Sequence, residues 1–306
     1  MFMFLAKRFG ASGLIVIGIT LITFLLSYFI PADPVRMLAG RSATQETVES
    51  IRHQLGLDQP LPVQYLKYLG RLVQGDLGRS YKQKTQVAEL IASRMPATLK
   101  LLVGAIFFEV LFGIPAGIFA ASRRGRKADN LAMIASFVGV SAPQFVVGLL
   151  LLWVFAYKLA LFPLGGYGGL SHLILPAVTL GITGGGWYSR MMRSSMVDVL
   201  QQDYIRTARA KGVRESAVVL VHGLRNAVLP VIAMIGMDIG FFMSWTVVVE
   251  SVYGWPGIGQ LTWQSIQVID TPVIMGVTLV AALAIVIGNF MADLIMPLID
   301  PRLRVR

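Results

Sequence analysis

Residues 97–121 read ATLKLLVGAIFFEVLFGIPAGIFAA, an apolar run with Lys100 and Glu109 as its charged residues. A membrane-spanning helix needs about 20 mainly apolar residues, because the hydrocarbon core is about 30 Å thick. This stretch therefore predicts a membrane-spanning helix. Five other long apolar runs predict further spans: Phe9–Ile30, Leu131–Tyr157, Leu173–Met192, Ala227–Val249 and Val273–Met296. Gly184–Gly186 interrupts the run from Leu173 and predicts either a hinge or a close packing point between helices.

The composition agrees with this interpretation. Of the 306 residues, 55% are hydrophobic and 14% are charged, and the mean hydropathy is +0.68. Soluble domains average about 25% charged residues, so this chain has too few charges to cover a water-facing surface. We predict an all-α, polytopic membrane protein with six transmembrane helices, organised as a single transmembrane domain over residues 1–306.

The net charge of +11 could indicate nucleic-acid binding, but the positions of the basic residues explain it differently. They gather in loops on one side of the six-helix topology: Lys7, Arg8, Arg123, Arg124, Arg126, Lys127, Arg190, Arg193, Arg206, Arg209, Lys211, Arg214, Arg225, Arg302, Arg304 and Arg306. Short cytoplasmic loops carry such an excess of Lys and Arg. We therefore expect both termini in the cytoplasm, membrane lipid around the helices, and no nucleic-acid partner.

Residues 31–96 form a predicted extracytoplasmic insertion with two short amphipathic helices. Ser42 with Gln45 resembles a capping box, and Gly56 is a plausible helix end. The apolar face of the first helix consists of Val48, Ile51 and Leu55, and that of the second consists of Val63, Leu66, Leu69 and Leu72.

Nearer the C-terminus, the glycine-rich GWPGIG at 254–259 predicts an outer re-entrant turn, with Trp255 at the membrane interface.

The loop at residues 194–226 is predicted to be cytoplasmic and to receive another protein. It contains DYIRTARAKG at 203–212. Asp203 can cap a short helix, Ala208 and Ala210 favour it, and Gly212 can end it. Small side chains permit a close approach of backbones, and the neighbouring basic side chains can pair with acidic groups. An ordinary basic cytoplasmic loop is the alternative interpretation.

This loop, with LRNAVLP at 224–230, resembles the EAA loop of the permeases of peptide-type ABC importers, which carry dipeptides, oligopeptides, nickel or glutathione. Further blocks agree in order along the chain: PADPVRMLAG at 31–40, QLGLDQPLPVQY at 54–65, GDLGRS at 75–80, ESVYGWPGIG at 250–259, DTPVI at 270–274 and DPRLR at 300–304. The length and the insertion resemble the first permease of the pair.

The resemblance implies a permease of the bacterial inner (plasma) membrane, half of the translocation path of an ATP-driven importer for peptides or related small solutes. Its implied partners are a second homologous permease, two cytoplasmic ATPase subunits and an extracytoplasmic substrate-binding protein. The chain has no phosphate-binding Gly-rich loop ending in Lys-Ser/Thr, so we expect no enzymatic activity and no cofactor of its own, with ATP bound by the partners. The implied ATPase-coupling residues are Asp203, Tyr204, Arg206, Thr207, Ala208, Arg209, Ala210, Lys211 and Gly212.

Two acidic residues lie in the middle of predicted spans, Glu109 and Asp238. Intramembrane carboxylates are costly, and they are functional candidates by default. Either could line the translocation path, where an acid would favour a cationic or amine-bearing substrate. Either could also be a polar contact buried between helices.

Other classes of membrane protein remain alternatives to the importer permease. A stand-alone secondary transporter or channel would leave the loop around Asp203 without a role. A membrane-embedded enzyme needs a catalytic or metal motif, and neither HExxH nor GxSxG occurs. A scaffold would not need acids inside its helices. The His residues, at 53, 172 and 222, lie on separate loops, which argues against a metal site.

Overall fold

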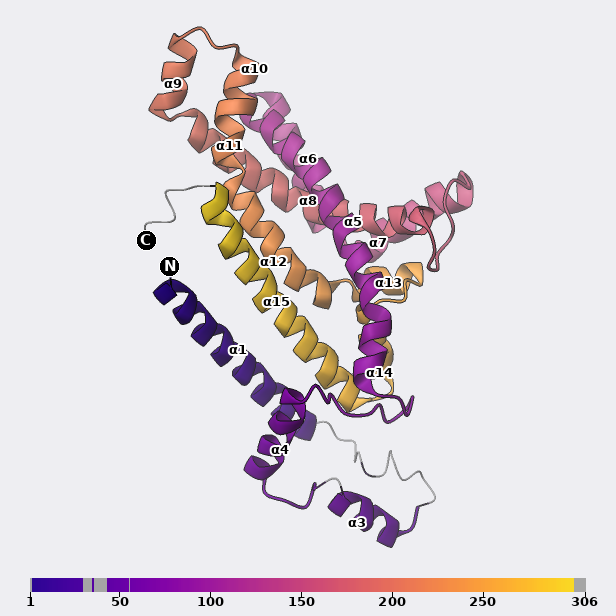
Figure 1. Cartoon of the computed structure of the whole chain (residues 1–306). Coiled ribbons are helices and arrows are strands. Elements are labelled where there is room, and N and C mark those ends of the chain that lie inside the picture. Colours follow the sequence, from indigo (N-terminus) through magenta and orange to yellow (C-terminus); the bar gives the residue numbers. More distant parts are fainter. Residues whose placement is uncertain (1, 30–34, 36–42, 55, 300–306) are drawn as a thin grey trace. The chain divides into compact units, whose positions relative to one another are not determined.

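The computed structural model describes residues 2–29, 35, 43–54 and 56–299. Apart from one isolated antiparallel bridge, Arg79 to Gln86, regular secondary structure in this part of the chain is helical, which confirms the all-α prediction. The elements are α1 (Phe2–Phe29), α3 (Gln45–Gln54), α4 (Leu61–Val73), α5 (Val87–Ser122), α6 (Lys127–Ser141), α7 (Gln144–Leu151), the π-helical η1 (Leu152–Lys158), α8 (Leu170–Leu200), α9 (Asp203–Ala210), α10 (Glu215–Ala217), the π-helical η2 (Val218–Gly223), α11 (Leu224–Ala227), α12 (Leu229–Trp245), α13 (Val247–Tyr253), α14 (Ile258–Gln267) and α15 (Thr271–Ile299) (Figure 1).

The chain forms two compact units, one of residues 1–96 and 257–284 and the other of residues 97–256 and 285–306. In the first unit, α4 packs against α1 through aromatic rings. The ring of Phe24 lies 5.4 Å from that of Tyr65 and 5.8 Å from that of Tyr68. The hydroxyls of Tyr65 and Thr20 lie 3.0 Å apart and form a hydrogen bond.

The two short helices predicted between residues 31 and 96 are present as α3 and α4. Gly56 has φ +67° directly after α3, a conformation that suits glycine and ends the helix as predicted. At its start, Thr44 Oγ1 accepts a hydrogen bond from the Thr47 amide at 3.3 Å. The predicted cap Ser42 and the predicted face residue Leu55 lie outside the described residues, as does the DPRLR block at 300–304.

The second amphipathic helix buries only part of its predicted face, since Leu69 and Leu72 are half-buried. Leu66 and Val63 are 66% and 40% exposed, whereas Gln64 is buried. The Gln64 side-chain amide donates to the Gln59 carbonyl at 2.7 Å and to the Leu57 carbonyl at 3.3 Å, so both of its N–H donors have an acceptor although it is buried. Periodicity identified the helix, but the side of α4 that packs depends on its tyrosines.

A buried carboxylate organises the connection between α4 and α5 in the first unit. Asp270, 1% exposed at the start of α15, accepts hydrogen bonds from Ser80 Oγ at 2.5 Å and from the amides of Tyr81 and Lys82 at 3.1 and 3.3 Å. Three donors satisfy the carboxylate that burial would otherwise penalise. The conformation of this connection therefore depends on one side chain almost two hundred residues away.

The second unit is built around α8, which contacts α6, α7, α11, α12 and α13. Glycines bring α5 and α6 close to it. A Cβ added at Gly113 would lie 2.4 Å from the Cβ of Tyr188, and one at Gly186 would lie 2.3 Å from the Ser136 carbonyl oxygen. The helix runs unbroken through Gly184–Gly186. Of the two alternatives for this triplet, close packing is therefore correct.

The predicted span Leu131–Tyr157 is bent near its middle, and a second bend lies at the start of the predicted span Ala227–Val249. α6 and the helix formed by α7 and η1 meet at 99°, and the helix of residues 215–227 meets α12 at 47°. Pro143 follows the first break and forces Ala142 into an extended conformation, with ψ 127°. Pro230, at the start of α12, lacks the amide hydrogen that a continuous helix would use. The apolar run Leu131–Tyr157 is therefore divided between two helices.

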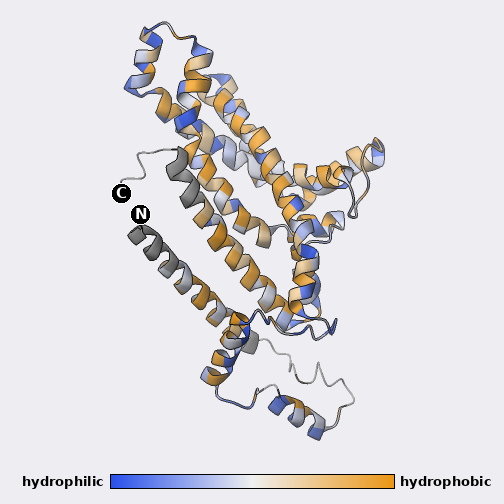
Figure 2. Ribbon diagram, in the orientation of Figure 1, coloured by the Kyte–Doolittle hydropathy of each residue, from blue (hydrophilic) through white to orange (hydrophobic). Residues whose placement is uncertain are grey.

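Several apolar spans are present, although their number depends on how the bent pairs are treated. In the described residues, α5 and Thr271–Met291 of α15 are long and apolar enough to cross a membrane, and up to four spans result if each bent pair counts as one. Gly10–Leu25 of α1 forms a shorter apolar stretch. In Figure 2, α12 and α15 are largely hydrophobic, whereas α3 is more polar.

The glycine-rich turn after α13 is present, but its tryptophan is not at a lipid interface. Gly254 has φ +61° and ends α13. Trp255 is 1% exposed, and its indole Nε1 donates to the Ala97 carbonyl at 2.9 Å. The prediction that Trp255 lies at the membrane interface is wrong, because the hydrogen-bond acceptor of its indole N–H lies inside the protein.

Candidate functional site

The loop that carries DYIRTARAKG forms a short helix, as predicted. α9 spans Asp203–Ala210, and Gly212, with φ +76°, ends it. The cap differs from the prediction. Gln202 occupies the N-cap position and makes no side-chain hydrogen bond there, whereas Asp203 is the first helical residue. Its carboxylate lies 3.6 Å from Arg206, and both side chains are exposed.

A small apolar core holds α9 against the helix that follows it. Ile205, Ala208 and Val218 are buried together, with Leu200 and Val213 packed against them. Ala208 therefore points into the loop. The other eight residues of the predicted coupling set are exposed.

Polar contacts close the same loop. Arg209 donates to both carboxylate oxygens of Glu215, at 2.6 and 3.0 Å. These hydrogen bonds raise the pKa of the Arg209 guanidinium above its usual value. The Asn226 amide donates to the Tyr204 hydroxyl at 2.7 Å. Glu215 and Asn226 were missed in the sequence, because nothing in a loop sequence indicates which side chains meet across a turn.

The two intramembrane acids, far apart in the sequence, come together in the second unit. Glu109 of α5 is 3% exposed, and its carboxyl contacts that of the half-buried Asp238 on α12. Tyr188 of α8, 1% exposed, donates its hydroxyl to Asp238. Gly184 leaves room for the Glu109 carboxyl, since an added Cβ would overlap its Oε1. Tyr188 was not predicted, because a contact across three helices leaves no signal in residue spacing.

This carboxyl pair is an unusual chemical environment. Glu109 Oε2 has no hydrogen-bond partner among the described residues. Two adjacent carboxylates repel each other strongly in a low dielectric, and either a shared proton or a bound cation removes the repulsion. No group of three or more His, Cys, Asp or Glu residues in the described part of the chain could hold a metal ion.

Comparisons with known proteins cover nearly the whole chain. The family model described as "Binding-protein-dependent transport system inner membrane component" matches residues 113–305. The corresponding N-terminal model, "Binding-prot-dependent transport system membrane comp, N-term", matches residues 1–102. The chain belongs to this family.

Curated relatives show which type of permease within this family the chain resembles. It is 43% identical over 286 residues, 94% of each chain, to "Glutathione transport system permease protein GsiC" of Escherichia coli (strain CFT073). The same identity and coverage hold for the K12 strain, and identity is 42% for Salmonella paratyphi A. The protein is thus a multi-pass inner-membrane permease of a peptide-type ABC importer. It is not itself an enzyme, and ATP is bound by ATPase partners.

Solved structures support the fold. The permease matches inward-facing structures of the MetNI methionine ABC transporter with a TM-score of 0.59 and 17% identity in one crystal form. The match covers 69% of this chain and 96% of that one. A second crystal form gives the same TM-score with 18% identity.

Proposed function

We propose that this permease forms half of the translocation path of an importer for peptide-like solutes, the class to which glutathione belongs. A second homologous permease forms the other half, and an extracytoplasmic binding protein delivers the substrate. The relatives that are 43% identical are named as parts of a glutathione transport system, which supports this substrate class. The observation that supports coupling to the ATPases is the loop around α9, which is exposed and is held together by contacts within the loop.

In this proposal two cytoplasmic ATPase subunits drive the cycle, one of them docked on α9. A docked helix transmits movement only if it is firmly attached to the rest of the permease. The buried core of Ile205, Ala208 and Val218 provides this attachment, and so does the Arg209–Glu215 ion pair. Exposed Ala210 and Lys211 then present a small and a basic side chain to the partner. ATP binding would move the loop as a lever and switch the path between two states.

The docking surface is tested by a bulky substitution at an exposed position of α9. Ala210→Trp should leave the loop folded but abolish most ATP-driven uptake, while ATP hydrolysis continues. Leu220→Trp is the matched control, because Leu220 is 54% exposed but lies on η2; it should transport normally. Uptake and hydrolysis are measured on the reconstituted importer. Normal uptake by Ala210→Trp would remove α9 from the docking surface.

The proposed topology has six crossings, with both termini in the cytoplasm and residues 31–96 outside. The crossings are α1, α5, the bent α6–η1 pair, α8, the span Ala227–Val249 that contains α12, and α15. This number requires the bent α6–η1 pair to cross the membrane once. The basic loop at 194–226, the coupling loop, then lies in the cytoplasm, in keeping with the excess of Lys and Arg there.

We further propose that Asp238 faces the path and that Glu109 lies behind it. Asp238 is half-buried, whereas Glu109 is almost fully enclosed. Met237 and Phe241, on the neighbouring face of α12, are 45% and 53% exposed. A carboxyl beside an open apolar face can meet the ammonium group of a passing peptide, and the Tyr188 hydroxyl holds that carboxyl in place.

A further inference from the structure

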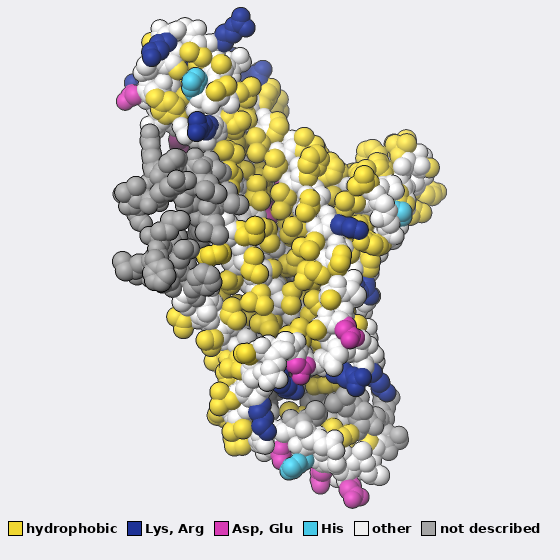
Figure 3. All heavy atoms as spheres, in the orientation of Figure 1, with side chains coloured by type: hydrophobic (Ala, Val, Ile, Leu, Met, Phe, Trp, Pro, Cys, Tyr) yellow, Lys and Arg dark blue, Asp and Glu magenta, His cyan; other side chains and the backbone are white. Residues whose placement is uncertain are grey.

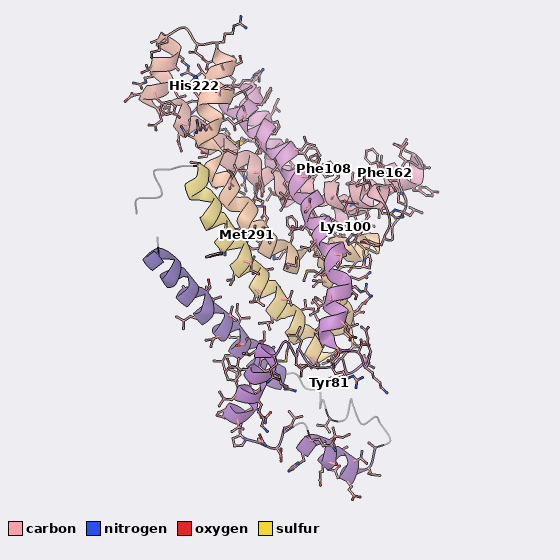
Figure 4. The ribbon with its side chains drawn as sticks, viewed as in Figure 1. Tyr81, Lys100, Phe108, Phe162, His222 and Met291 are labelled. Atoms are coloured by element: carbon pink, nitrogen blue, oxygen red, sulfur yellow. The ribbon has the colours of Figure 1, made fainter. Side chains whose placement is uncertain are left out.

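An apolar groove in the second unit lies between the outer parts of α5 and α8, by the proposed topology. Its volume is about 610 Å³, within the range of small-molecule sites. The space-filling view shows a broad hydrophobic surface on this face, and Figure 4 labels Lys100 and Phe108 along α5 (Figures 3 and 4). The lining side chains that matter most are Leu99, Val103, Phe107, Phe108, Leu173 and Ala177.

The length of the groove matches one leaflet of a bilayer. Along α5 it extends from Leu99 to Phe108, a rise of about 14 Å at about 1.5 Å per residue. Half of a hydrocarbon core about 30 Å thick is about 15 Å. On α8 the lining runs from Leu170 to Ala177, so both walls begin at the same end.

A cationic side chain, Lys100, lies at the end of the groove where both walls begin. Lys100 Nζ donates to the Tyr167 hydroxyl at 2.8 Å and lies 5.0 Å from the centre of its ring. The Tyr167 ring packs edge-on against Trp255, with centroids 4.9 Å apart. No carboxylate pairs with Lys100 among the ion pairs of the described residues. An ammonium group has three donors, so two remain for an anion.

We propose that the groove holds one acyl chain of an anionic phospholipid of the outer leaflet, with its phosphate on Lys100. The inference rests on the topology proposed above. The Lys100 ammonium pairs with the phosphate of the headgroup, and the apolar walls of the groove contact the acyl chain. A helix of another subunit is a poorer fit, because helix pairs in membranes pack through small residues. Here the exposed wall consists of larger side chains, with Val103 65% and Phe107 58% exposed.

The test measures lipid retained by the assembled importer. The complex is delipidated and supplied with phosphatidylglycerol or with phosphatidylcholine that has the same acyl chains. The lipid that remains bound is then measured by native mass spectrometry. Wild-type complex should retain phosphatidylglycerol preferentially. Lys100→Gln should lower its affinity about fivefold, the expected effect of one cationic side chain at an anionic surface. Val103→Trp should expel the lipid by filling the groove while Lys100 stays intact.

Lys158→Gln is the matched control. Lys158 also lies near aromatic rings, 5.7 Å from that of Trp153 and 6.0 Å from that of Tyr157, but it does not line the groove. Equal losses for Lys100→Gln and Lys158→Gln would overturn the site, since binding would then follow general surface charge. A photoreactive residue at position 103 that crosslinks to the second permease rather than to lipid would also overturn it. ATP-driven uptake by the wild-type importer is measured separately. A failure of uptake would count against the importer proposal, whereas a failure of selective lipid retention would count against the lipid site.

Discussion

The ion pair of Asp129 with Arg193 joins the start of α6 to α8, next to the loop at residues 194–226. Arg193 Nε and Nη2 each lie 2.6 Å from a carboxylate oxygen of Asp129. The Gly125 amide adds a third hydrogen bond at 3.0 Å. Asp129 is 1% exposed and Arg193 is 29% exposed. We predict that Asp129→Asn destabilises the permease, because the amide leaves the guanidinium without its anion.

The magnitude follows from the partial burial of the pair. Breaking a fully buried pair costs about 3–5 kcal/mol, and an exposed pair contributes about 0–1 kcal/mol. Water reaches Arg193, so we expect about 2 kcal/mol here, between these limits. For a domain of this size that loss corresponds to a fall in Tm of about 4–8 °C.

The assay is thermal unfolding of the purified importer in detergent at low and high salt. Arg193→Lys should cost about half as much, since it keeps the charge and loses the paired geometry. Arg206→Gln is the control, because its pair with Asp203 is 3.6 Å long and both side chains are exposed; we expect no measurable change. A Tm for Asp129→Asn within 1 °C of the wild type would refute the reasoning.

Three further predictions concern the path, the topology and the packing. Asp238→Asn should keep expression and ATPase coupling but lower uptake of a Lys-containing dipeptide more than of an Ala-only one; equal losses would mean a structural role. A reporter at Lys67 should be external and one at the C-terminus cytoplasmic, and a cytoplasmic signal at Lys67 would contradict the six-span topology. Gly186→Ala should lower thermal stability by about 1–3 kcal/mol, because its Cβ would meet the Ser136 carbonyl oxygen at 2.3 Å. Gly10→Ala, with nothing within 4 Å, should not destabilise, and equal effects of the two would argue against the packing account.

Features that depend on neighbouring residues could be predicted from the sequence. Long apolar runs identify membrane helices because the bilayer sets their length. The end of α9 follows from Gly212, which adopts a left-handed conformation that other residues resist. The end of α3 at Gly56 follows for the same reason. The family blocks, likewise, are short local motifs, and they identified the importer permease correctly.

Features that depend on distant residues required the tertiary structure. The apolar run Leu131–Tyr157 predicted a span, but not the 99° angle between its two helices. Ala208 was expected on the docking surface, yet it lies against Val218 inside the loop.

The sequence by itself determined that this is an all-α membrane permease with a basic loop at residues 194–226, because apolar length, charge distribution and helix ends are encoded locally. Only the tertiary structure brought Glu109, Tyr188 and Asp238 together from three helices. It also buried Trp255 against Ala97. The physical reason is that each helix has several faces of similar hydropathy in a membrane protein. Which face packs inward is decided by the shapes of its neighbours, and glycines such as Gly184 provide the room.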